Sequence, residues 1–313
     1  MLELIWRLYM FGPEGLSYRA MEALRPIGEA GVLQPSAFPE VIYELKPNLD
    51  TMLKNARLIT NAQGLADQAY ALEKSAGTFR VVVLGDSFTM PSGVPIQEAY
   101  HTVLEDRLNQ ESAGRRYEFI NFGVGGYNLR IYLAVLERKA LAYAPDVVLI
   151  GFCPVNDTEV MPEYHFQERY KAKRIGRAFL RMYSFERLQR LIADAFSSHQ
   201  RKEPDYNAPY MRDMFSRFAS ATQGRIPVVV ANLNHRPTPK PLVNLLKQLC
   251  AEHGFHFIDL SAFFKTVDAS QFDVHQSDTH PNAKAHRIFA DLLGDFMKHE
   301  GLLGERNPAA SGP

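Results

Sequence analysis

Four short segments, each following an apolar run, hold residue types that could carry out acyl transfer. They are GDS (85–87), GVGGYN (123–128), CPVNDT (153–158) and QSDTHPN (276–282). Together they supply a hydroxyl group, a glycine-rich turn, a carboxamide, and an acid beside an imidazole. A site for acyl transfer needs a nucleophile, a base oriented by a carboxylate, and N–H donors for an oxyanion. The segments therefore predict one site if the fold brings them together.

The elements that must position these segments are strands and helices in alternation. Short β-branched or apolar runs predict strands at 80–85, 117–123, 146–152, 226–233 and 256–260. Apolar residues at helical spacing predict helices at 97–110, 130–143, 241–254 and 282–299. Gly254 is a typical helix stop and Asn282 a typical N-cap.

This alternation predicts an α/β protein of the doubly wound, flavodoxin-like kind. We expect a three-layer sandwich with a mainly parallel five-stranded sheet, because nearly continuous apolar strands are typical of sheets covered on both faces. In such a sheet, ligands bind beyond the carboxyl ends of the strands. The four polar segments are predicted to lie there.

In this order the four segments resemble the signature blocks of the SGNH, or GDSL-type, hydrolase superfamily of esterases and lipases. The resemblance spans residues 80–297. The block VVVLGDSFT implies that Ser87 is the nucleophile, and DTHPN implies that His280 is the base. Taken alone, Ser87 could equally be a turn residue and His280 a residue at a helix entry.

The resemblance also implies an oxyanion hole. In NFGVGGYN the family glycine corresponds to Gly126, and in PVND the family asparagine corresponds to Asn156. The backbone N–H groups of Gly126 and Ser87 and the side-chain amide of Asn156 would be the donors. A positive φ at Gly126 and an N-cap or Asx-turn at Asn156 are the structural alternatives.

Two positions depart from the usual family pattern. Most members carry the acid three residues before the histidine, where this chain has Ser277. Asp278 lies two residues before it, a spacing also familiar in the superfamily, including some polysaccharide O-acetyltransferases. We therefore take Asp278 as the orienter of His280 and Asp273 as the alternative. Val155 replaces the glycine that often precedes the family asparagine.

The expected organisation has a hydrolase domain at 78–300 after an N-terminal extension at 1–77. VIYEL (41–45) and ARLIT (56–60) predict two short strands in the extension, with KPNLD as the turn between them. Residues 160–225 predict a helical insertion, and 301–313 a disordered tail.

The insertion is strongly basic, since 168–202 hold ten Lys or Arg and three Asp or Glu. A solvated basic face is the simpler interpretation of this excess. A lid, or a contact for an acidic glycan, a partner or a membrane surface, is the alternative.

The composition excludes several classes of protein. The zero net charge argues against a nucleic-acid partner. Cys153 and Cys250 cannot form a disulfide framework, and without CxxC or HExxH patterns we expect no metal and no cofactor. The segment LIWRLYMF is too short to span a bilayer and lacks a cleavage site. We expect it to pack on the main domain, an interfacial helix being the alternative, in a cytoplasmic protein.

The functional prediction is a serine esterase with Ser-His-Asp catalysis that acts on a small-molecule or glycan ester. We favour O-acetyl or short acyl groups on a carbohydrate. A polysaccharide O-acetyltransferase, a lipase or lysophospholipase, and a non-catalytic glycan-binding module are the alternatives. The sequence carries no expectation about the oligomeric state.

Overall fold

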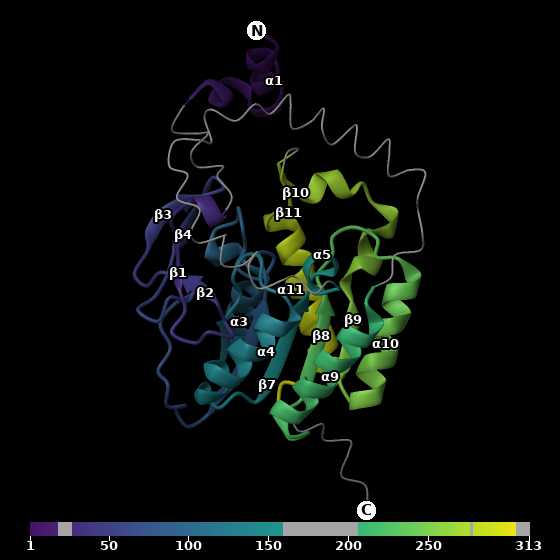
Figure 1. The fold of residues 1–313 in the computed structure, drawn as a ribbon. Helices are drawn as coiled ribbons and strands as arrows, with labels where there is room; N and C mark the ends of the chain where they lie inside the picture. The colour runs from purple at the N-terminus through teal and green to yellow at the C-terminus, as the bar shows by residue number, and fades with distance from the viewer. Residues whose placement is uncertain (18–26, 159–205, 276–277, 305–313) are drawn as a thin grey trace, which may run out of the picture.

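A five-stranded parallel sheet forms the centre of the chain (Figure 1). The computed structural model describes residues 1–17, 27–158, 206–275 and 278–304. The sheet contains β5 (Thr78–Gly85), β6 (Arg116–Asn121), β7 (Val147–Phe152), β8 (Val228–Asn232) and β9 (His256–Asp259). Their order is β6-β5-β7-β8-β9, with every neighbouring pair parallel. This is the flavodoxin-like strand order, so the predicted fold class and its five strands are confirmed.

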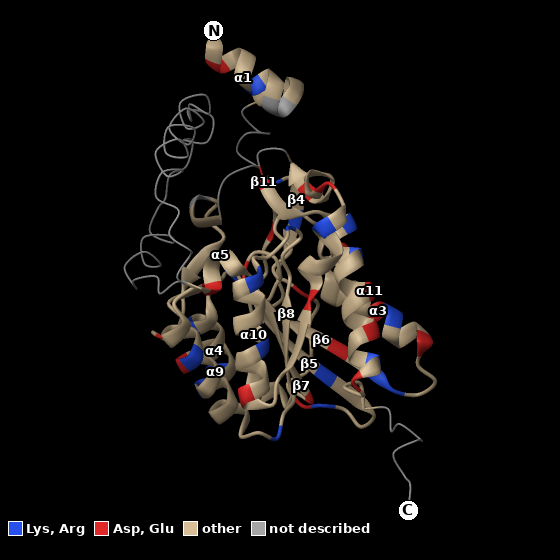
Figure 2. Cartoon of the chain, turned by 90° about the vertical axis from the view of Figure 1, so that its right-hand side faces the viewer, with Lys and Arg blue, Asp and Glu red and all other residues tan. Residues whose placement is uncertain are grey.

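Helices cover both faces of the sheet (Figure 2). One face carries α3 (Tyr100–Glu111) and α11 (Ala283–His299), and the other carries α4 (Leu129–Arg138), α9 (Ala208–Thr222) and α10 (Lys240–His253). Short 3-10 turns precede α3 and follow α4, namely η3 (Ile96–Glu98) and η4 (Ala140–Tyr143). The predicted helices at 97–110 and 130–143 are therefore each divided in two.

The sequence of the central strand β5 is apolar without interruption because both of its faces are buried. Val81 and Val83 belong to the core under α3 and α11, whereas Val82 and Leu84 belong to the core under α4 and α10. Successive side chains of a strand point to opposite faces, and here both faces are buried. All four side chains have no exposed surface.

The predicted helix signals agree with the observed ends. The Asn282 side chain accepts hydrogen bonds from the backbone N–H groups of Lys284 and Ala285 and so caps α11. Gly254 follows α10 with a φ of 68°. These local signals place the start of α11 directly after the segment that carries His280.

The N-terminal extension forms two separate hairpins rather than the one predicted. β1 (Leu33–Pro35) pairs with β2 (Tyr43–Leu45), and β3 (Asp50–Leu53) pairs with β4 (Ala56–Ile59). The prediction that KPNLD joins two paired strands is therefore wrong. The strand before it, β2, pairs with β1, and the strand in ARLIT, β4, pairs with β3.

The turn between β3 and β4 is formed by Lys54 and Asn55, with φ values of 51° and 62°. Positive φ at both central residues is typical of a type I′ hairpin turn.

The extension is attached to the sheet domain at the carboxyl ends of the parallel strands. The Tyr43 hydroxyl donates to the Gly125 carbonyl over 2.9 Å, and the Tyr127 hydroxyl donates to the Tyr43 carbonyl. Val41, Tyr43 and Leu45 lie in the same core cluster as β5. The extension and the sheet thus share one hydrophobic core.

The first helix, α1 (Leu2–Phe11), is followed by η1 (Gly12–Leu16). Leu2, Ile5 and Tyr9 are 81%, 57% and 68% exposed, so the expected packing on the main domain is not found for these side chains. Among the described residues, no helix has the length and apolarity needed to cross a bilayer.

Several predictions concern residues outside the described part of the chain. The basic segment 168–202 lies entirely outside it, as do 160–205 of the predicted insertion and 305–313 of the predicted tail. Within the described remainder of the insertion, α9 serves as the crossover helix before β8.

Arg80 is an ion-pairing residue buried within the sheet. It is 1% exposed, its Nε lies 2.6 Å from Glu118 Oε2, and its Nη1 donates to the carbonyls of Leu72 and Tyr143. We expect Arg80→Met to lower the free energy of unfolding by about 3–5 kcal/mol, because Glu118 would keep a buried charge without this partner. Urea denaturation measures the loss.

The control for this prediction is Arg138→Met. Arg138 pairs with Glu40 over 2.7 Å, but both side chains are about half exposed. Such exposed pairs contribute less than about 1 kcal/mol. Equal losses in the two variants would contradict the importance assigned to the buried pair.

Candidate active site

Ser87 lies just beyond the carboxyl end of β5, at the central strand of the sheet. The strand ends at Gly85, where an added Cβ would lie 2.0 Å from Thr89 Oγ1, so the close approach of the Thr89 side chain requires glycine. The backbone N–H groups of Met90 and Ser92 donate to the carbonyls of Asp86 and Ser87, each over 2.9 Å. This tight turn fixes the Ser87 side chain at the carboxyl end of the sheet.

His280 and Asp278 reach Ser87 from a short hairpin near the C-terminus. The hairpin pairs β10 (Asp273–His275) with β11 (Asp278–Pro281). Residues two apart on a strand point to the same side, so the spacing Asp-x-His places both side chains on one face. His280 Nε2 lies 2.8 Å from Ser87 Oγ, and His280 Nδ1 is hydrogen-bonded to Asp278 Oδ1.

The Asp278 carboxylate is held charged by the ammonium group of Lys54 and by its hydrogen bond with His280. Burial alone would raise the pKa of Asp278, but hydrogen bonds and charges from His280 and Lys54 outweigh it. The pKa of Asp278 is therefore well below its ordinary value. Lys54 Nζ lies 2.8 Å from Asp278 Oδ2, the oxygen that His280 Nδ1 does not contact.

Asp273, the alternative orienter, has other partners. Its two oxygens contact His235 Nε2 over 2.7 Å and Arg236 Nη2 over 2.6 Å. The described contacts of its carboxylate thus lie with the loop after β8 rather than with His280. His286 is fully buried in α11, and burial lowers its pKa to about 3.

Asn156 lies in the short helix α5 (Pro154–Asp157), directly after β7. Its side-chain amide donates to Asp86 Oδ2, and Asp86 Oδ1 accepts from the Phe88 N–H over 2.9 Å. Burial raises the pKa of Asp86, and these hydrogen bonds oppose the rise only in part. Asp86 therefore links the Ser87 turn to Asn156.

Two neighbours of Asn156 take different positions. Asp157 is fully buried, and its Oδ2 accepts from the Cys153 N–H over 2.7 Å, which braces this loop. Val155, which stands where the family often has glycine, is 76% exposed.

A pocket of about 320 Å³ joins these segments. Its lining includes Ser87, Gly126, Asn156 and His280, so four of the five predicted site residues share it, and the fifth, Asp278, contacts His280. Gly126 has a φ of 84°, a conformation that favours glycine. The structural and oxyanion interpretations of Gly126 are therefore compatible.

Sequence reasoning missed Lys54 and the pairing of His235 with Asp273. Lys54 lies 224 positions before its acidic partner, in a turn that contains no glycine. The local signal was the Asn55 that follows it, since asparagine tolerates positive φ. Within residues 1–17, 27–158, 206–275 and 278–304, no cluster of three or more His, Cys, Asp or Glu could hold a metal.

Comparisons with known proteins identify the family of this chain. A family model described as the GDSL-like lipase/acylhydrolase family matches residues 83–288. A search of curated proteins finds no significant match.

Among solved structures, an acetylxylan esterase from Geobacillus stearothermophilus matches 73% of this chain and 97% of its own, at 15% identity and a TM-score of 0.46. A psychrotrophic esterase from Pseudoalteromonas sp. matches 71% of this chain and 97% of its own, at 16% identity and a TM-score of 0.46. These low values give no guide to a substrate, and the family assignment rests on the sequence match.

The contacts of the two aspartates predict unequal effects on activity. We expect Asp278→Asn to lower kcat on an activated acetyl ester by about 10²-fold or more, because a neutral amide neither fixes the imidazole tautomer nor stabilises the imidazolium. Asp273→Asn should cause a much smaller loss, since its partners are His235 and Arg236. Steady-state kinetics of both variants test the ranking, and the reverse order would reassign the orienter.

Proposed function

The chain belongs to the GDSL-like lipase/acylhydrolase family of ester-bond hydrolases, and we propose that it is a serine esterase whose nucleophile is Ser87. The observation that carries the proposal is the continuous hydrogen-bonded series from Ser87 Oγ through His280 to Asp278. A nucleophile in contact with a base that is itself held by a carboxylate is the arrangement that acyl transfer requires.

In the proposed first step, Ser87 Oγ attacks the ester carbonyl while His280 Nε2 takes its proton. Asp278 holds the Nδ1–H tautomer and stabilises the imidazolium that forms. As the tetrahedral intermediate collapses, His280 gives the proton to the departing alcohol, and an acyl–Ser87 ester remains. The short contact between Ser87 and His280 supports this direct transfer.

In the second step, water attacks the acyl–Ser87 carbonyl. His280 accepts a proton from the water and returns it to Ser87 Oγ as the carboxylic acid leaves. The balance is one ester and one water consumed, and one acid and one alcohol released.

Gly126 N–H, Ser87 N–H and the Asn156 amide are the proposed oxyanion donors. The shared pocket lining of the three residues supports this assignment. Asp86 uses one N–H of the Asn156 amide, and the second N–H of the same group remains for the oxyanion.

For the substrate, we propose a short acyl ester, with O-acetyl groups on a carbohydrate as the favoured class. The pocket volume lies at the lower end of the range for small-molecule sites, which suits a short acyl chain. Ile27, Phe88 and Val155 give it apolar walls, and Ser92 and Thr279 add hydroxyl groups that a polar alcohol such as a sugar could contact.

Replacement of the nucleophile tests the proposal directly. Ser87→Ala should abolish hydrolysis of activated esters and leave thermal unfolding unchanged, because only one partly exposed oxygen is removed. An acyl-length series that includes acetylated sugars, run on wild-type protein beside this variant, should show the highest kcat/KM at the shortest acyl group. Retention of most activity by Ser87→Ala would refute the mechanism, and a preference for long chains would refute the substrate class.

The oxyanion assignment predicts a separate effect at Asn156. Asn156→Ala should lower kcat by about 10²–10³-fold with little change in KM, because the lost hydrogen bond strengthens only as the oxyanion forms. An unchanged kcat would return Asn156 to a structural role through Asp86. Circular dichroism of the variant separates loss of catalysis from loss of fold.

A further inference from the structure

Lys54 reaches the centre of the site from outside the segment that matches the family model. The match begins at residue 83, whereas Lys54 lies in the turn between β3 and β4 of the N-terminal extension. Its side chain is only 14% exposed. Nζ lies 2.8 Å from Asp278 Oδ2 and 3.1 Å from His280 Nδ1.

We propose that Lys54 is a positioning residue for the Ser87–His280–Asp278 series, an inference that rests on the proposed function. By binding Oδ2 of Asp278, the ammonium group fixes the carboxylate rotation that presents Oδ1 to His280. Through Lys54, the N-terminal extension thereby positions the catalytic groups.

The need for such a partner follows from the burial of Asp278. Its side chain is 15% exposed, so little water reaches its second oxygen. A buried carboxylate oxygen without a partner costs free energy, and the carboxylate could rotate to seek another donor. Lys54 supplies a charged donor at that oxygen and removes this freedom.

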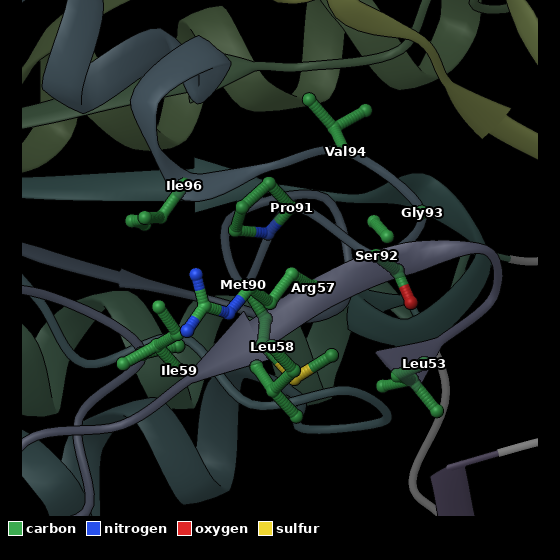
Figure 3. A pocket seen from close by; sticks show the side chains of 12 residues that line it. Leu53, Arg57, Leu58, Ile59, Met90, Pro91, Ser92, Gly93, Val94 and Ile96 are labelled. Atoms are coloured by element: carbon green, nitrogen blue, oxygen red, sulfur yellow. The ribbon is translucent and has the colours of Figure 1, made fainter. Parts of the chain in front are cut away.

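The hairpin around Lys54 is itself held in place. β3 and β4 form four residue pairs, from Asp50 with Ile59 to Leu53 with Ala56, and the tight turn follows directly. Figure 3 shows Leu53 and Leu58 of this hairpin beside Met90 and Ser92, in the loop that follows Ser87. The loop that follows Ser87 therefore lies against the hairpin that carries Lys54.

The charge of Lys54 also acts on His280. Positive charge beside the imidazole disfavours the imidazolium, whereas Asp278 and the buried Asp86 favour it. Two further imidazoles interact electrostatically with His280: that of His235, which is paired with Asp273 and Arg236, and that of His286.

The test compares full-length Lys54→Met and Lys54→Arg with the wild type, using a short acyl ester across the acidic and neutral range. Lys54→Met should lower kcat roughly tenfold, because misplaced catalytic groups lose rate steeply. It should also change the acidic limb of the kcat profile, since a cation 3.1 Å from His280 Nδ1 is lost. Lys54→Arg should restore the position of that limb, because it keeps the charge.

The matched control is Arg57→Met, which breaks an ion pair on the same hairpin. Arg57 pairs with Asp50 over 2.7 Å, with side chains 63% and 60% exposed and no contact with Asp278 or His280 among the described interactions. It should leave both kcat and the acidic limb unchanged. If Arg57→Met changed kcat and the acidic limb as Lys54→Met does, the cause would be a less stable hairpin, and the proposal would be overturned.

The outcomes also separate this inference from the proposed function. If Ser87→Ala is inactive while Lys54→Met keeps the wild-type kcat and pH profile, the role of Lys54 is refuted and the serine mechanism stands. If Ser87→Ala stays active, the proposed function fails first. If Lys54→Met does not fold, the pH profile of Lys54→Arg decides, because a displaced limb despite the retained charge would overturn the proposal.

Discussion

The contact between Ser87 Oγ and His280 Nε2 joins segments 193 residues apart in the sequence. Ser87 belongs to a turn after the central strand. His280 belongs to a hairpin that follows all five strands of the sheet in the sequence. The contact therefore requires the whole sheet to be correctly ordered and α11 to start where it does. Asn282, two residues beyond His280, caps α11 and sets its start at Ala283.

Much of the fold was predictable because each signal was local. The apolar run through β5, the glycine after α10 and the asparagine before α11 depend on a few neighbouring residues. The parallel sheet covered on both faces followed from the alternation of strands and helices. By contrast, the β3–β4 hairpin was missed, since its strands have four residues each and its turn lacks glycine. Its pairing depends on packing against the sheet domain, which no local pattern reports.

The candidate site also contains residues that local patterns could identify and one that they could not. Ser87, Gly126, Asn156 and His280 could be named because each follows a strand or precedes a helix in a recognisable block. The choice of Asp278 over Asp273 is supported by strand geometry, since a spacing of two keeps the acid and the histidine on one face of β11. Lys54 could not be named, because a lysine in a short turn carries no sign of which distant carboxylate it will meet.

The shared core of the extension and the sheet has a consequence for modularity. Val41, Tyr43 and Leu45 share one hydrophobic core with Val82 and Leu84, so removing the extension would strip apolar cover from that core. The family-matched segment is therefore not a transplantable unit. Recombination between relatives would have to exchange the extension and the sheet together, and the two parts are expected to change in sequence as a coupled pair.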